Sequence, residues 1–184
     1  MAKQCQSEHT AARYAALESS LLKLLHNKTF AEISVKDICL DAAIPRRTFY
    51  HYFTGKEDLL DALIADLMME CALEVMPESG SEPAVRQTLL RFFLFWKNRR
   101  ETLTLLLRRN QAPCIIRHAT DQTGKGAFRL TGNIPPDSWS ENLISLARVT
   151  GVFSIVFHWV LSDCRESAEE MAACTARFLT ESVL

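Results

Sequence analysis

The sequence lacks an excess of charge of either sign. Its 184 residues hold 21 Lys and Arg against 22 Asp and Glu, which gives a formal net charge of −1. A protein that coats or packages nucleic acid relies on a global positive charge, so this composition excludes that class. Any attraction to a polyanion must come from basic side chains gathered in one place. With 48% hydrophobic residues, the chain is long enough to bury a sizeable core.

Motifs for catalysis, cofactors and metals are also missing. There is no G-x-S-x-G, no phosphate-binding glycine loop and no H-E-x-x-H. The histidines are scattered without an evident Ser or Cys partner: His9, His26, His51, His118 and His158. The cysteines form no C-x-x-C pair and have no zinc-like spacing: Cys5, Cys39, Cys71, Cys114, Cys164 and Cys174. We expect no enzyme, no metal and no cofactor, with reduced thiols; a redox role for Cys164 and Cys174 stays open.

Long hydrophobic runs are absent as well. The most apolar stretch, Val149–Leu161, is roughly a dozen residues long, short of the ~20 that span a bilayer. Met1–Thr10 is polar and mixed in charge, unlike a signal peptide. We therefore expect a cytoplasmic protein without a membrane partner.

What the sequence does contain is a helix start of unusual clarity near residue 34. Ser34 and Asp37 have the spacing of a capping box, which predicts that a helix begins there. One apolar face follows at positions i, i+3, i+4 and i+7, made of Val35, Ile38, Cys39 and Ala42.

A second short helix is predicted to follow Pro45, whose fixed φ suits a first helical turn. Its apolar face is aromatic: Phe49, Tyr52 and Phe53. Its opposite face carries Arg46, Arg47, Tyr50 and His51. A helix with a buried aromatic face and a basic outward face suits the DNA major groove. Thr54 and Gly55 then start a third helix, so the pattern predicts a helix-turn-helix.

The stretch Ala42–Glu57 also resembles a known family. TetR-like (tetracycline repressor-like) regulators carry a run similar to Ala-Gly-Val-Ser-x-x-Thr-Phe-Tyr-x-Tyr-Phe-x-x-Lys-Glu, and this chain keeps Thr48 to Phe53 with Lys56 and Glu57. It departs at two positions, with Ala43 at the turn glycine and Pro45 at the capping serine. Alanine with a positive φ would cost about 1 kcal/mol, and a lost cap about as much. The resemblance is sharp over residues 11–65 and extends beyond them only in size and helical character.

Eight side chains are candidates for contact with double-stranded DNA: Ser34, Lys36, Arg46, Arg47, Thr48, Tyr50, His51 and Lys56. The two arginines can read guanine edges with paired N–H donors, each good pair giving about 1–3 kcal/mol of discrimination. The resemblance places the Thr48 and Tyr50 hydroxyls on phosphates, contacts that fix register rather than sequence. Lys56 adds a cation at a helix N-terminus, a favourable phosphate site. Packing alone is the interpretation we favour for Tyr52.

The fold is predicted to be all-α with about nine helices and no strands. Expected helices cover residues 7–26, 34–42, 45–53, 56–75, 85–98, 101–109, 114–119, 140–162 and 167–183. Residues 77–83 form a break, and residues 121–138 a loop with three Gly and two Pro. We expect a helix-turn-helix domain over 1–58 and a helical effector-binding and dimerisation domain over 59–184.

The C-terminal part offers candidates for an effector site and a dimer interface. An apolar cavity of the kind found between bundled helices would be lined by Phe92, Phe95, Trp96, His118 and Phe128; plain core packing is the alternative for each. A basic run from Lys97 to Arg117 is either a solvated face or a site for an acidic effector. By resemblance, the last two helices pair with a second copy, through Val152, Val156, Trp159, Met171, Thr175 and Phe178.

We hypothesise a homodimeric transcriptional regulator that binds a palindromic DNA operator site-specifically and is controlled by a small-molecule effector. Repression is the commoner outcome in the family that the chain resembles, so we expect a repressor. One alternative is a helical protein-interaction module without specific DNA binding. Another is a constitutive DNA binder whose core is filled and which has no effector.

Overall fold

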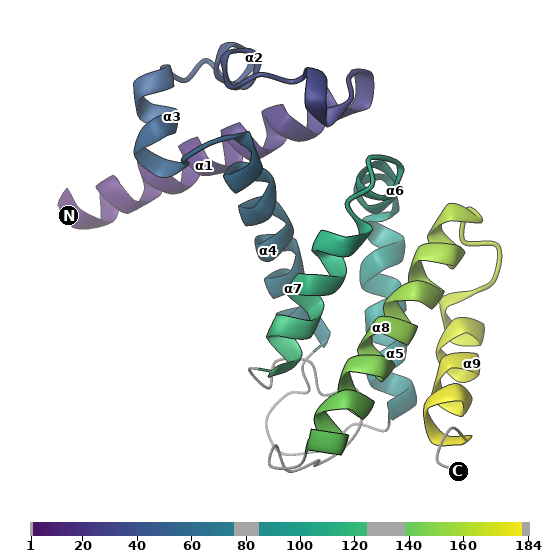
Figure 1. Ribbon diagram of the computed structural model, residues 1–184. Coiled ribbons are helices and arrows are strands. Elements are labelled where there is room, and N and C mark those ends of the chain that lie inside the picture. Colours follow the sequence, from purple (N-terminus) through teal and green to yellow (C-terminus); the bar gives the residue numbers. More distant parts are fainter. Residues whose placement is uncertain (1, 76–84, 125–138, 182–184) are drawn as a thin grey trace. The chain divides into compact units, whose positions relative to one another are not determined.

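The computed structural model describes residues 2–75, 85–124 and 139–181 (Figure 1). Over those ranges it contains helices and no strand, which confirms the predicted fold class. The helices are α1 (Ala2–Asn27), η1 (Phe30–Glu32), α2 (Val35–Asp41), α3 (Arg46–Tyr52), α4 (Lys56–Val75), α5 (Val85–Asn98), α6 (Arg100–Arg108), α7 (Ala112–Gly124), α8 (Trp139–Leu161) and α9 (Ala168–Glu181).

Two compact units divide the chain, Met1–Ile64 and Ala65–Leu184. They meet inside α4, six residues beyond the predicted boundary after residue 58. That each unit is an independent domain stays a prediction. The predicted loop over 121–138 is wrong at its start, because α7 continues to Gly124; the remainder of that loop lies outside the described residues.

The N-terminal unit is built on α1, with α2 and α3 lying along one side of it (Figure 1). Leu17, Leu21 and Leu25 of α1 are fully buried. The Ser20 hydroxyl donates a hydrogen bond of 3.1 Å to the Ile38 carbonyl and so joins α1 to α2. Ser34 begins α2 as predicted.

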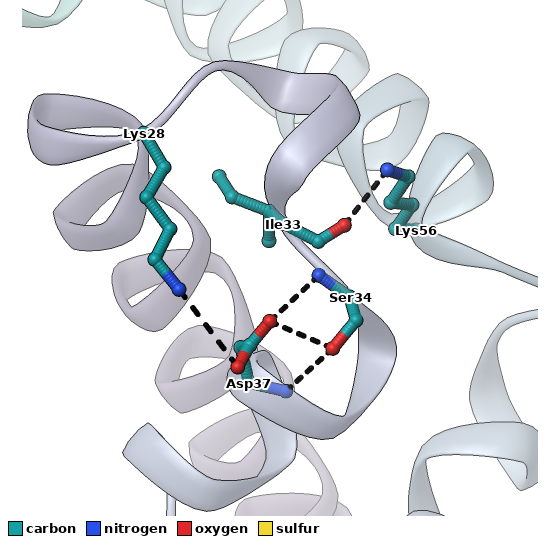
Figure 2. Close-up of polar contacts among 5 residues, drawn as sticks. All are labelled: Lys28, Ile33, Ser34, Asp37 and Lys56. Atoms are coloured by element: carbon teal, nitrogen blue, oxygen red, sulfur yellow. Dashed lines mark hydrogen bonds and ion pairs between the residues drawn. The ribbon is translucent and has the colours of Figure 1, made fainter.

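The capping box at Ser34 is complete (Figure 2). The Ser34 hydroxyl accepts a hydrogen bond from the Asp37 amide (3.2 Å), and the Asp37 carboxylate accepts from the Ser34 amide (2.9 Å) and hydroxyl (2.7 Å). These hydrogen bonds lower the pKa of Asp37, so the carboxylate form that the cap requires persists to lower pH.

The turn between α2 and α3 places Ala43 at a φ of 53°, in the left-handed region. The Ile44 amide donates to the Cys39 carbonyl (2.9 Å) and the Ala43 amide to the Leu40 carbonyl (3.3 Å). This pair of bonds is the Schellman ending of a helix, which glycine usually occupies because other residues are strained there.

Replacing Ala43 with glycine is therefore expected to raise the free energy of unfolding of the N-terminal unit by about 1 kcal/mol, the steric cost of a Cβ at positive φ. Urea unfolding followed by circular dichroism measures the change. The matched control is Ala42→Gly: Ala42 has an ordinary φ of −73°, and there glycine should destabilise by about 0.5–1 kcal/mol. A loss of stability in Ala43→Gly would contradict the strain.

The C-terminal unit packs around α5, which contacts α8 and α9. Its core is aromatic, with ring centroids 5.3 Å apart both for Phe92 and Phe153 and for Phe93 and Trp159. A chain reversal at Asp163 and Cys164, which both have positive φ, turns α8 back so that α9 lies beside it (Figure 1).

Helix α8 overturns one prediction from the sequence. Leu143–Leu161 spans 19 residues with a mean hydropathy of 1.6, long and apolar enough to cross a membrane by length and composition alone. The apolar stretch predicted from the sequence was too short, because Leu143, Ile144 and Leu146 extend it on the N-terminal side of Val149. Core helices of soluble proteins meet the same criterion, and α8 packs against α5, α6, α7 and α9.

Candidate nucleic-acid interface

The outward face of α3 carries the side chains that the sequence assigned to it. Phe49 is fully buried and Phe53 nearly so, whereas Arg46, Arg47, Tyr50 and His51 are exposed. The Arg46 guanidinium lies 5.9 Å from the centre of the Tyr50 ring, one helical turn away. The buried aromatic anchor thus fixes which way the basic face points.

A hollow of about 1000 Å³ lies between this face and the N-terminal half of α1. We call it the α1–α3 hollow. Its lining comes from two helices: His9, Thr10 and Arg13 of α1, and Arg47, Thr48, Tyr50, His51 and Tyr52 of α3. None of the α1 residues was predicted from the sequence. The sequence did contain an indication of them, since His9 and Arg13 have the i, i+4 spacing that places two side chains on one helix face.

Tyr52 is the residue that docks α3 onto α1. Its ring meets Tyr14 edge-on at 6.0 Å, and Tyr14 also lies 4.6 Å from Phe53. Hydrogen bonds to its hydroxyl group from Arg13, and then from Thr10, lower the pKa of Tyr52. Tyr52 therefore packs, as the sequence predicted, and also interacts through its hydroxyl group with side chains of α1.

Lys56 departs from the prediction that it holds a DNA phosphate. Its ammonium donates to the carbonyls of Phe30 (2.7 Å), Ala31 (3.3 Å) and Ile33 (2.7 Å) and lies 4.7 Å from the centre of the Phe30 ring; Figure 2 shows the bond to Ile33. Three N–H donors meet three carbonyls, so the ammonium is committed to the backbone. A cation at a helix N-terminus opposes the dipole, and these carbonyls offset that.

The remaining DNA-contact candidates in the N-terminal unit differ in how accessible their side chains are to DNA. Ser34 is engaged in its cap, Lys36 is exposed on α2, and Thr48 is half-buried on the rim of the hollow. Their contacts with DNA stay predictions.

Three of the effector candidates of the C-terminal unit are core residues in the part of the chain that the structure describes. Phe92, Phe95 and Trp96 are fully buried within the aromatic core. His118 is half-buried on α7, and Phe128 lies outside the described residues. The buried atoms Trp96 Nε1 and Thr175 Oγ1 have no hydrogen-bond partner in the described part of the chain.

Two arginines of the basic run from Lys97 to Arg117 are paired with carboxylates. Arg99 reaches Glu70 at 3.1 Å and Glu74 at 3.5 Å, and its guanidinium stacks 3.9 Å from the Phe95 ring centre. Arg100 pairs with Asp163 at 3.2 Å. These pairs account for Arg99 and Arg100 without an acidic effector, whereas the role of the other basic residues of the run stays a prediction.

Four of the predicted dimer residues are buried within a single chain. Val152, Val156, Trp159 and Thr175 are at most 1% exposed within a single chain, because these faces of α8 and α9 cover α5. Met171 is half-buried and Phe178 is exposed. Among the residues of these helices whose burial is described, the large apolar side chains that are exposed are Leu143, Ile144, Leu146, Leu161 and Phe178.

Comparison with known proteins identifies relatives of the N-terminal unit and of the whole fold. The model of a family of bacterial regulatory proteins, the tetR family, matches residues 20–63. The chain is 42% identical over 87 residues to the HTH-type transcriptional regulator EthR of Mycolicibacterium smegmatis. That match covers 44% of this chain and 40% of EthR, so it spans less than half of the curated relative.

Solved structures resemble the chain over nearly its whole length. A TetR transcriptional regulator from Streptococcus agalactiae has a TM-score of 0.66 at 15% identity, covering 96% of this chain and 98% of that one. The regulator FadR from Bacillus subtilis, solved in complex with stearoyl-CoA, has a TM-score of 0.56 at 14% identity, covering 93% and 100%. At such identities the likeness shows the fold alone.

Proposed function

We propose that the chain, whose residues 20–63 match the model of the tetR family of bacterial regulatory proteins, is a transcriptional repressor of that family. It binds a palindromic DNA operator as a cytoplasmic homodimer and is controlled by a small-molecule effector. The observation that carries the proposal is the exposed basic face of α3, which is held in place by buried Phe49 and Phe53.

Sequence-specific binding rests on α3. Arg46 and Arg47 are the side chains assigned to base edges, where a guanidinium donates two parallel hydrogen bonds to guanine. Tyr50, His51 and Thr48 are assigned to the sugar–phosphate backbone, together with Lys36 of α2. Lys56 is left out, because its ammonium is bound to three carbonyls.

Dimerisation compensates for the small number of base pairs that one recognition helix can contact. A seven-residue helix such as α3 reads only a few base pairs, and two copies about one DNA turn apart read an inverted repeat. The surface we assign to it is the exposed apolar part of α8 and α9. Phe178 anchors this surface: the residue is 44% exposed, yet its ring lies so close to Gly151 that a Cβ on Gly151 would come within 3.3 Å of Phe178 Cε1.

The effector site is assigned to the aromatic core of the C-terminal unit. An unpaired buried donor such as Trp96 Nε1 carries a desolvation cost of about 1–3 kcal/mol, which a ligand offering an acceptor would relieve. Thr88 and Thr175 are the buried polar side chains of the described part of this unit. The effector is therefore largely apolar, with a hydrogen-bond acceptor, and not held by a buried charge.

Selection of bound duplexes from a random DNA pool tests the proposal. We expect an enriched inverted repeat, bound by the full chain at least about a hundredfold more tightly than by the Arg47→Ala, Tyr50→Ala double variant, since one base contact alone is worth about 1–3 kcal/mol. Arg165→Ala, exposed on the C-terminal unit, serves as the charge-matched control and should bind like the parent.

Two readouts separate this proposal from its rivals. Sedimentation of the double variant must still give a dimer; no enrichment at low salt, where phosphate contacts are strongest, favours a protein-interaction module instead. Adding candidate apolar effectors to the complex should release DNA. If none raises the melting temperature or releases DNA, a constitutive DNA binder is the better description.

A further inference from the structure

We propose that the C-terminal unit carries a second surface for self-association, on which α4 of one copy packs against α5 of another copy. The surface consists of two stripes of exposed side chains, one on each helix. Neither helix belongs to the apolar surface of α8 and α9 that is assigned above to the dimer. The association goes beyond the proposed function and does not require DNA.

The stripe on α4 is acidic and apolar. In the part of α4 that belongs to the C-terminal unit, five exposed side chains recur at i, i+3, i+4, i+7 and i+8 and so share one face: Asp66, Met69, Glu70, Leu73 and Glu74. This part of α4 contains no basic residue. Met69 is 44% and Leu73 66% exposed, although the solvent face of a helix is usually polar. The α4 stripe therefore has the composition of a contact surface.

The stripe on α5 is its counterpart, because it is basic and apolar. Four side chains recur at i, i+4, i+8 and i+11 along the helix: Arg86, Leu90, Leu94 and Lys97. Leu94 is 40% exposed and Leu90 is half-buried, and both cations are exposed. Helix α5 contains no acidic residue. The two stripes thus share one pattern, with apolar side chains between charges of a single sign, and their signs are opposite.

Arg99 shows that the two stripes adjoin. Its guanidinium pairs with Glu70 at 3.1 Å and with Glu74 at 3.5 Å, and it follows directly after α5, two residues beyond Lys97. A surface with an acidic and a basic stripe next to each other is self-complementary, since a twofold axis places α4 of each copy on α5 of the other. Such an interface closes on itself instead of growing into a filament.

The charges of the two stripes are not used up within one chain. Arg99 offsets one of the three carboxylates of the α4 stripe, and among the described residues Asp66, Arg86 and Lys97 form no ion pair. Exposed ion pairs contribute little affinity, so the apolar side chains supply the attraction and the charges select the partner. A partner with one basic and apolar helix would cover only the α4 stripe, whereas a second copy covers both stripes.

Sedimentation velocity of the full chain without DNA tests the inference. Over about 1–300 µM, the range of a weak interface, the largest species of the parent should reach twice the mass of the largest species of Leu73→Glu. The substitution should weaken the association at least about a hundredfold, because the twofold axis removes two leucines at once. Leu40→Glu, at a leucine of the N-terminal unit that is 77% exposed, is the matched control and should assemble like the parent. This ratio of masses is expected whether or not α8 and α9 form a dimer.

Reversing the charges tests the complementarity of the stripes. Asp66→Lys, Leu73→Lys makes the α4 stripe basic, since the two lysines and Arg99 outnumber its remaining two carboxylates. Arg86→Glu, Lys97→Glu makes the α5 stripe acidic. Each variant alone should fail to double its mass, because like charges then face each other across the twofold axis. An equimolar mixture should double again, since each altered stripe meets its opposite on the other chain, and this recovery also shows that both variants are folded.

Three results would overturn the inference. If the mass of the parent does not rise over this concentration range, the two stripes are left for a different protein as occupant. If Leu73→Glu assembles like the parent, or if the mixture keeps the mass of its separate components, the association belongs to another surface. The proposed function survives each of these results, because selection of bound duplexes tests it separately.

Discussion

Replacing Phe49 with alanine is expected to lower the free energy of unfolding of the N-terminal unit by about 3–5 kcal/mol, the usual cost of removing a buried phenyl ring. Phe49 is fully buried, and its ring centre lies 5.4 Å from that of Tyr50 and 5.5 Å from that of Phe53. A unit of this size has a single small core, so the cavity has few neighbours that can collapse into it.

Two optical signals separate this local loss from global unfolding. The three tryptophans, Trp96, Trp139 and Trp159, all belong to the C-terminal unit, so their fluorescence follows that unit alone. Circular dichroism at 222 nm follows both units. In Phe49→Ala an early urea transition should appear in the dichroism and not in the fluorescence.

The neighbouring position provides the control for this prediction. Tyr50 is 51% exposed on the same helix, so Tyr50→Ala should cost less than about 1 kcal/mol, in the range usual for surface positions. Both variants should lose DNA affinity, but only Phe49→Ala by unfolding the recognition helix. A destabilisation below about 1 kcal/mol in Phe49→Ala would show that the aromatic face does not support α3.

Local signals in the sequence were sufficient for most of the fold. The capping pair Ser34 and Asp37 marked the start of α2, and periodicity gave both ends of α4 and of α5. Such signals act within one or two turns, where capping and spacing decide the structure. The 3-10 helix at Phe30–Glu32 was missed, because a single turn has no periodicity to detect.

The site was less predictable because its members come from separate helices. That α3 is a recognition helix could be inferred from its own residues. The contribution of His9 and Arg13 depends on how Tyr52 docks against Tyr14, a contact between residues 38 positions apart that no local pattern specifies. Four of the six predicted dimer residues are core residues for a related reason: apolar spacing does not distinguish a helix face that covers α5 from one that faces outward.

Lys56 shows that a motif can locate a residue without revealing its contacts in the folded chain. The resemblance located the residue and its place at the start of α4, and charge alone suggested phosphate. Its actual acceptors, the carbonyls of Phe30, Ala31 and Ile33, lie at least 23 residues earlier in the chain. These carbonyls bracket the turn that leads into Ser34, so Lys56 fastens the start of α2 to the start of α4.

Replacing Lys56 with methionine is accordingly expected to lower the free energy of unfolding of the N-terminal unit by about 2–3 kcal/mol. Methionine keeps the apolar stem against the Phe30 ring but removes three charge-assisted donors, each worth about 1.5–3 kcal/mol where the partner stays dry. The total is less than three times that value, since the half-exposed site lets water reach the carbonyls. The early urea transition in circular dichroism, absent from tryptophan fluorescence, measures it.

The salt dependence of DNA binding then decides between the two roles of Lys56. If Lys56 binds only the three backbone carbonyls, the folded Lys56→Met variant should keep the parent's slope of log K against log salt. If Lys56 held a phosphate instead, the slope would fall by about 0.9 with little loss of stability. Lys36→Met, from an exposed lysine on α2, is the matched control and should show the opposite behaviour: unchanged stability with a reduced slope. Lys56→Arg, which keeps the charge but not the compact geometry of an ammonium, should fall between parent and methionine in stability, because the three carbonyls converge on a single nitrogen.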